Sequence, residues 1–67
     1  EVLLRVDAGL VGQAREDAIG RVTGRVEVHL ARGDAVGLLV DDSRLEARTG
    51  AAWRRRLLTA LALAERR

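Results

Sequence analysis

A histidine and two charged neighbours form the most suggestive chemical cluster in the sequence. Arg25, Glu27 and His29 occupy alternate positions in the stretch RVEVHLAR. Alternate residues of a strand point to the same face, so a strand here would place the three side chains together. A histidine beside a carboxylate can act as a general acid–base pair. A single histidine on the wet face of a strand is more commonly a solvated side chain, and that is the interpretation we favour.

The other candidate motifs lack the partners that their chemistry requires. Asp41 and Asp42 could offer carboxylates to a hard cation, but Ca²⁺ takes about six to eight oxygen ligands and the spacing of a calcium loop is absent. Ser43 has neither an adjacent base nor a Gly-x-Ser-x-Gly context. The segment GLVGQAREDAIG follows a predicted strand but lacks the glycine spacing and the Lys-Ser/Thr ending of a phosphate-binding loop. We therefore expect no catalytic, cofactor-binding or metal-binding residues and no enzymatic activity.

The run WRRR at residues 53–56 is the candidate for nucleic-acid binding, because arginines contact phosphates and tryptophan stacks on bases. Successive helical residues point about 100° apart, so the three arginines do not form one stripe. Trp53 falls on the apolar side with Leu57 and Leu61. The formal net charge is only +2, with 10 acidic residues distributed along the chain. A small nucleic-acid-binding domain that uses its arginines stays an alternative to a protein-interaction domain.

The length of the chain limits the stability of its core. A chain of 67 residues makes one domain and buries only about 60% of the surface that its unfolded form exposes. A protein partner or a second copy of the chain is therefore expected to complete the core. The sequence has no cysteine and a single histidine, so it cannot form a disulfide or a cluster of thiolate and imidazole metal ligands.

The amino-acid usage is restricted. Lys, Pro, Phe, Tyr, Met, Asn and Cys are all absent, and apart from His29 every basic side chain is arginine. A GC-rich genome explains this usage, and so does a designed, reduced-alphabet domain with no biological function, which stays an open alternative. No apolar run approaches the roughly 18 to 20 residues that span a bilayer, and the chain starts at Glu1 with a strand pattern and no basic signal sequence. We expect a cytoplasmic protein without membrane contact.

Hydrophobic periodicity predicts the elements of the first half of the chain. Residues 2–6 form a strand, and Asp7 is a candidate N-cap. Apolar residues three or four apart predict a helix over residues 10–22, ended near Gly24. The alternation in RVEVHLAR predicts a second strand over residues 25–32.

The second half of the chain predicts a hairpin and a closing helix. Gly and Asp in residues 32–35 favour a reversal into a strand over residues 36–40, which alternates again. After a polar turn, RLEAR at residues 44–48 either extends the sheet or begins the last helix, and we favour a short strand. Residues 50–65 form the terminal helix, with Thr49 as a candidate N-cap.

These elements predict a single α+β domain over residues 1–67. The order βαββα suits a three- to four-stranded, mostly antiparallel sheet with both helices on one face. The predicted core contains the residues that strand alternation and the helical stripe turn inward: Leu4, Val6, Val26, Val28, Leu30, Val36, Leu38, Val40, Trp53, Leu57 and Leu61.

Four leucines are left over once this core is filled. Leu58 and Leu63 flank the apolar stripe of the terminal helix, and Leu3 and Leu39 fall on the sheet face opposite the helices. Exposed apolar surface of this kind is typical of interaction sites. We predict that these four leucines contribute to an interface with a second copy or with a protein partner. The predicted open face of the sheet carries Leu3, Arg5, Arg25, Glu27, His29, Gly37 and Leu39.

The sequence also resembles a family of assembly domains. The succession of VLLRV, an amphipathic helix, GRVEV, RGDAV, RLEAR and a closing helix is similar to the C-terminal domain of peripheral-stalk (stator) proteins. These proteins belong to rotary and secretion ATPases: the flagellar and type III secretion stator proteins and the related peripheral-stalk proteins of V-type ATPases. The resemblance implies a βαββα domain that follows a coiled coil, docks on an ATPase subunit and performs no catalysis. Two departures are the short connection at residues 29–32 and the absence of a coiled-coil arm from this chain.

Overall fold

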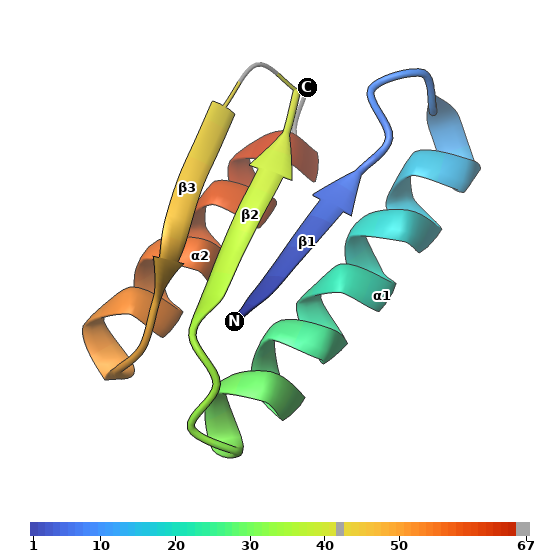
Figure 1. The fold of residues 1–67 in the computed structure, drawn as a ribbon. Helices are drawn as coiled ribbons and strands as arrows, with labels where there is room; N and C mark the ends of the chain where they lie inside the picture. The colour runs from blue at the N-terminus through green and yellow to red at the C-terminus, as the bar shows by residue number, and fades with distance from the viewer. Residues whose placement is uncertain (42, 66–67) are drawn as a thin grey trace.

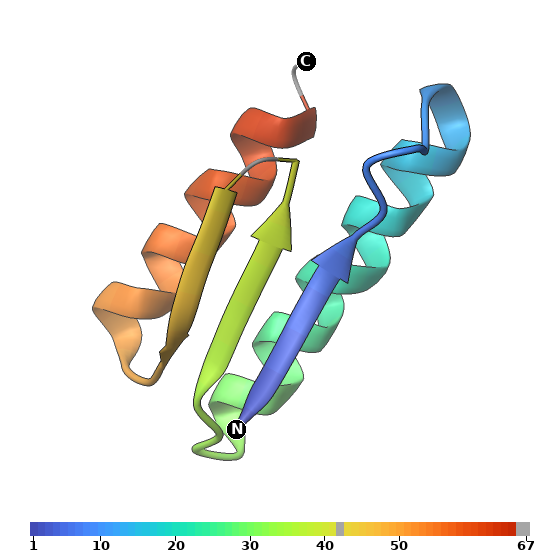
Figure 2. The ribbon, with the colours of Figure 1, turned by 45° about the horizontal axis from the view of Figure 1, so that its top comes forward.

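The computed structural model describes residues 1–41 and 43–65 and shows a three-stranded sheet covered on one face by two helices (Figure 1). In chain order the elements are β1 (Val2–Val6), α1 (Gly12–Ala31), β2 (Val36–Val40), β3 (Ser43–Arg48) and α2 (Ala51–Glu65). Figure 2 shows both helices behind the same side of the sheet. The predicted α+β class and the βαββα order are confirmed.

The sheet is mixed, whereas the sequence predicted mostly antiparallel pairing. Its order is β1-β2-β3, with β1 parallel to β2 and β2 antiparallel to β3. Parallel neighbours need a long crossover, and α1 supplies it. The register places Leu4 beside Leu38 and Val6 beside Val40, so that both pairs point toward the helices.

The prediction of a strand over residues 25–32 is wrong, because α1 continues to Ala31. Val26 is fully buried, whereas Val28 is 55% exposed. A strand would have turned these two side chains to the same face, but residues two apart on a helix point about 200° apart. The open sheet face therefore lacks the predicted Arg25, Glu27 and His29, which lie on α1.

The physical reason is that two periods fit the same residues. Val26, Val28 and Leu30 alternate as in a strand, but Val22, Val26 and Leu30 are also four residues apart. The buried residues of α1 are Ala18, Ile19, Val22 and Val26, which is one helical stripe. Gly24 lies inside the helix and does not end it.

The hairpin predicted around residues 32–35 is instead a connection from a helix to a strand. Gly33 has a φ of 86°, in the left-handed region that favours glycine, and its N–H donates to the Leu30 carbonyl at 3.0 Å. The hairpin of this fold lies between β2 and β3. Asp41 precedes that turn with a φ of 52°, and Asp42 lies outside the described residues.

The short strand predicted for RLEAR is confirmed within β3, and the terminal helix is confirmed as α2. The predicted N-caps are not. The Asp7 carboxylate accepts a hydrogen bond from the Gly9 N–H at 2.9 Å, and α1 begins later without a side-chain cap. At the start of α2 the carbonyl of Gly50, not the side chain of Thr49, accepts the hydrogen bond of the Arg54 N–H, at 3.0 Å.

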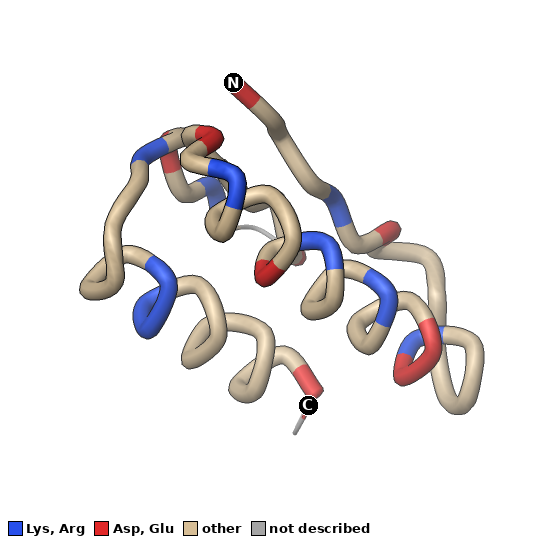
Figure 3. The backbone as a smooth tube through the Cα atoms, turned by 90° about the horizontal axis from the view of Figure 1, so that it is seen from below, with Lys and Arg blue, Asp and Glu red and all other residues tan. Residues whose placement is uncertain are grey.

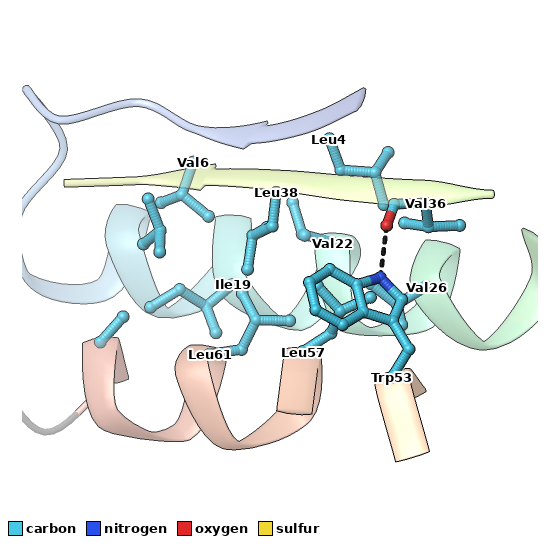
Figure 4. Close-up of a cluster of buried hydrophobic side chains, with 12 residues drawn as sticks. Leu4, Val6, Ile19, Val22, Val26, Val36, Leu38, Trp53, Leu57 and Leu61 are labelled. Carbon is cyan, nitrogen blue, oxygen red and sulfur yellow. Dashed lines mark hydrogen bonds between the residues drawn. The ribbon is translucent and has the colours of Figure 1, made fainter. Parts of the chain in front are cut away.

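The core lies between the sheet and the two helices (Figure 4). Of the predicted core, Val28 is wrong, and Leu30 is half-buried against the cluster. Ile19 and Val22 of α1 fill the space that the mistaken second strand was expected to fill. The remaining predicted residues are confirmed as buried: Leu4, Val6, Val26, Val36, Leu38, Val40, Trp53, Leu57 and Leu61.

Candidate interaction groove

A β-bulge in β3 determines how the outer edge of the sheet is built. Val36 pairs with Arg48 and Leu38 pairs with Leu45, so β3 has one residue more than β2 between the two pairs. The bulged backbone crowds Gly37 of β2. A Cβ at Gly37 would lie 2.8 Å from the Leu45 carbonyl oxygen, which leaves no room for a larger residue without a shift.

The bulge turns Arg48 toward the helices. A regular strand that directs Leu45 to the helix face would direct Arg48 to the open face, but the extra residue reverses this alternation. The guanidinium of Arg48 lies 5.4 Å from the centre of the Trp53 ring, a cation–π contact. Arg48 therefore covers the outer end of the core, where Trp53 is only 8% exposed.

A groove runs beside this edge, between β3 and the outward side of α2. We call it the β3–α2 groove. Its volume is about 570 Å³ along the helix, and it continues over the bulge. Aliphatic side chains form its floor, of which Leu63 is 57% exposed and Leu45 half-buried. The apolar lining is Leu45, Ala52, Ala60 and Leu63, and the polar lining is Arg44, Glu46, Arg48, Thr49, Arg55, Arg56 and Thr59, with Trp53 at the end.

The groove is basic. Arg44, Arg48, Arg55 and Arg56 line it together with one carboxylate, Glu46. Figure 3 shows that α2 carries its basic residues in one run near its start, whereas acidic and basic residues are interspersed along α1. Within residues 1–41 and 43–65 neither Arg55 nor Arg56 has an acidic partner. Their charges are therefore available to an anionic ligand.

Other arginines of the chain are already paired. Arg15 lies 2.9 Å from the Asp41 carboxylate across the fold, and Arg54 lies 2.8 Å from Glu27 between the two helices. The hydrogen bond and the charge of Glu27 raise the pKa of the Arg54 guanidinium further above its ordinary value. The basic groove is thus distinguished by unpaired arginines and not by the total charge of the chain.

The acid–base cluster predicted from the sequence does not form. His29 lies 3.1 Å from Asp34, which follows α1, whereas Glu27 pairs with Arg54. Arg25 is exposed on α1. The sequence placed these residues on a strand face that does not exist.

The weaker candidates are also dispersed. Ser43 is exposed at the start of β3, and the Asp41 carboxylate contacts Arg15 of α1. In the part of the chain that the structure describes, no group of three or more His, Asp or Glu side chains could hold a metal ion. Neither described helix is long and apolar enough to cross a membrane.

The four leucines predicted to mediate contacts lie in different places. Leu63 lines the β3–α2 groove. Leu58 is half-buried against the core. Leu3 is 52% exposed and Leu39 is half-buried on the open face of the sheet, away from the helices. The structure therefore offers two separate apolar surfaces and does not join the four residues into one.

Sequence reasoning missed the groove itself. Helical geometry separates Trp53 and Arg54 from Arg55 and Arg56, as the sequence predicted, but the last two share the groove with Arg44 and Arg48 of another element. The only local signal was Gly37 inside a strand pattern, since an isolated glycine there indicates a bulge.

A second, smaller groove of about 380 Å³ lies at the opposite edge of the sheet, between β1 and α1. It carries Arg5, Arg21 and Arg25 together with Asp7. This β1–α1 groove offers an internal comparison for binding experiments, because it also joins an edge strand to a helix.

Comparison of the chain with models of known protein families, with curated proteins and with solved structures found no match.

Proposed function

We propose that this domain is a non-catalytic protein-interaction domain that binds an acidic, aliphatic segment of its partner in the β3–α2 groove. The observation that carries the proposal is the combination of an aliphatic floor with arginines that have no carboxylate partner within the described residues.

Each part of the groove supplies a different component of the binding free energy. Burial of an aliphatic side chain against Leu45 and Leu63 is worth about 1.5 to 3 kcal/mol when it is complete. Guanidinium groups form paired hydrogen bonds with carboxylates, so Arg55 and Arg56 favour glutamate or aspartate beside that aliphatic group. The partner is therefore expected to combine both residue types in one short segment.

Nucleic-acid binding is the second candidate, and the arginine run supports it. Its stacking group is not accessible, however. The Trp53 indole N–H donates to the Val36 carbonyl at 2.6 Å, and Arg48 covers the ring. Binding to single strands commonly depends on aromatic platforms, so this geometry favours a protein ligand.

The resemblance to peripheral-stalk domains gives a narrower form of the same proposal, in which the partner is an ATPase subunit. The segment GRVEV, which that resemblance takes as a strand, is helical here. The βαββα order agrees with the fold that the resemblance implies.

The proposal is tested by calorimetric titration of the domain with a synthetic peptide that alternates valine with glutamate. Arg56→Glu and Leu63→Glu should each weaken binding by about tenfold or more, since one reverses a groove charge and the other charges the floor. Arg25→Glu makes the same charge change in the β1–α1 groove and is the matched control. It should leave the affinity within about twofold.

Two results would contradict the proposal. One is equal weakening by Arg56→Glu and Arg25→Glu, which would indicate non-specific attraction to a basic chain. The other is absence of peptide binding together with binding of single-stranded DNA that weakens steeply with salt, which would favour the nucleic-acid function.

A further inference from the structure

We propose that the acidic segment binds as an extended strand that joins the sheet along the free edge of β3. This inference rests on the proposed function, because it specifies how the ligand of the β3–α2 groove is held.

The first argument is the backbone of β3. It is the last strand in the order β1-β2-β3, and its described residues make no backbone hydrogen bonds on the outer side. The Leu45 carbonyl faces β2, as its closeness to Gly37 shows. Because N–H and C=O groups alternate in direction along a strand, those of Arg44 and Glu46 face outward. A row of donors and acceptors is thus open to another strand.

The second argument is the position of the groove relative to this edge. A strand added at the usual spacing of about 4.8 Å would extend the sheet over α2. Half of its side chains would point to the helix face and enter the groove toward Ala60 and Leu63. The other half would lie on the open face beside Arg44, which is 64% exposed.

This geometry predicts a residue pattern for the ligand. Aliphatic residues on the helix face would cover the floor, and acidic residues on the open face would pair with Arg44. At the end of the segment, a further carboxylate would reach Arg55 or Arg56. Alternation of aliphatic and acidic residues satisfies all three contacts.

The bulge limits the length of the added strand. Regular pairing of β3 ends where the bulge begins, after Leu45. Bulges at sheet edges commonly terminate pairing, so the ligand is expected to pair with Ser43–Glu46 at most and to leave Arg48 on Trp53.

A second copy of this chain fits the edge less well. Antiparallel self-pairing with Leu45 opposite Leu45 would place Arg44 beside Glu46 of the other copy, which is favourable on the open face. On the helix face, however, the same arrangement brings two sets of Arg55 and Arg56 together. Like charges at an interface are unfavourable, so an acidic ligand is preferred over a second copy.

The test uses N-methylated versions of the alternating valine–glutamate peptide. One version carries the methyl groups on the glutamate nitrogens and the other on the valine nitrogens. Because successive N–H groups of a strand face opposite edges, methylation on the paired edge removes the hydrogen bonds to β3. At least one version should bind about tenfold more weakly than the parent peptide. Loss on the glutamate nitrogens indicates an antiparallel added strand, and loss on the valine nitrogens a parallel one.

Amide hydrogen exchange gives a second readout. The outward N–H groups of Arg44 and Glu46 should exchange more slowly when the peptide is bound, by about tenfold at saturation. If both methylated peptides bind as tightly as the parent and these amides are unchanged, strand addition is wrong while the proposed function stands. If the parent peptide does not bind, the proposed function itself fails. If the amides are protected without peptide and the mass in solution doubles, the occupant is a second copy and the inference is overturned.

Discussion

The indole N–H of Trp53 donates to the carbonyl of Val36 at 2.6 Å and joins α2 to the start of β2 (Figure 4). Both residues are buried, Val36 completely. A buried carbonyl without a donor costs about 1 to 3 kcal/mol, so this single bond is a large contribution for a small domain. It also fixes the helix against the sheet at the end where the β3–α2 groove begins.

Trp53→Phe should therefore destabilise the fold although it keeps an aromatic ring. We expect the free energy of unfolding to fall by about 2 to 4 kcal/mol, from the unpaired carbonyl and the smaller ring. Urea denaturation measured by circular dichroism gives this value. An unchanged unfolding midpoint would show that the hydrogen bond is not important.

Gly37 is predicted to be the glycine least tolerant of substitution outside the turns. Gly37→Ala places a methyl group 2.8 Å from the Leu45 carbonyl oxygen, so the bulge must shift. A loss of about 1 to 3 kcal/mol is expected in thermal or urea unfolding. Gly24→Ala is the control, because nothing lies within 4 Å of its added methyl group. It should stabilise α1 by up to about 1 kcal/mol, and equal effects of the two changes would contradict the bulge.

Arg48 is predicted to shield the ring of Trp53. Arg48→Ala removes the cation 5.4 Å from the ring centre, so acrylamide should quench the tryptophan fluorescence more strongly. The accompanying loss of stability should be about 0.5 to 1 kcal/mol. Arg44→Ala, on the same strand but on the open face, should leave quenching unchanged. Equal quenching in all three proteins would place Arg48 elsewhere.

Val26 and Val28 distinguish a helix from a strand at residues 25–31. Val26→Ala should cost about 2 kcal/mol, because the side chain is fully buried. Val28→Ala should cost less than about 0.5 kcal/mol, because the side chain is exposed and alanine favours helices. Urea unfolding of the two variants measures the difference, and similar large losses would support the strand that the alternation predicted.

The predictable parts of this fold are those in which one period dominates. Val36, Leu38 and Val40 alternate without a competing helical spacing, and Trp53, Leu57 and Leu61 are four residues apart without a competing alternation. Residues 25–31 satisfy both periods. Their state is decided by tertiary contacts, since the helix lets Ile19 and Val22 join Val26 in the core.

The groove was less predictable than the fold because it depends on residues that are distant in sequence. Arg44 and Leu45 meet Arg56 and Leu63 only after the hairpin and α2 are in place. The bulge that reverses Arg48 is a property of the pairing with β2, and a single glycine indicates it weakly. Leu63, in contrast, was recognisable as a leucine outside the apolar stripe of its helix.

The most direct test of the β3–α2 groove is a map of backbone amide chemical shifts during titration with the alternating valine–glutamate peptide. The largest changes are predicted in β3 and on the outward side of α2, at Arg44, Glu46, Arg56 and Leu63. Largest changes at Arg5, Arg21 and Arg25 would place binding in the β1–α1 groove and contradict the assignment of the β3–α2 groove as the interaction site.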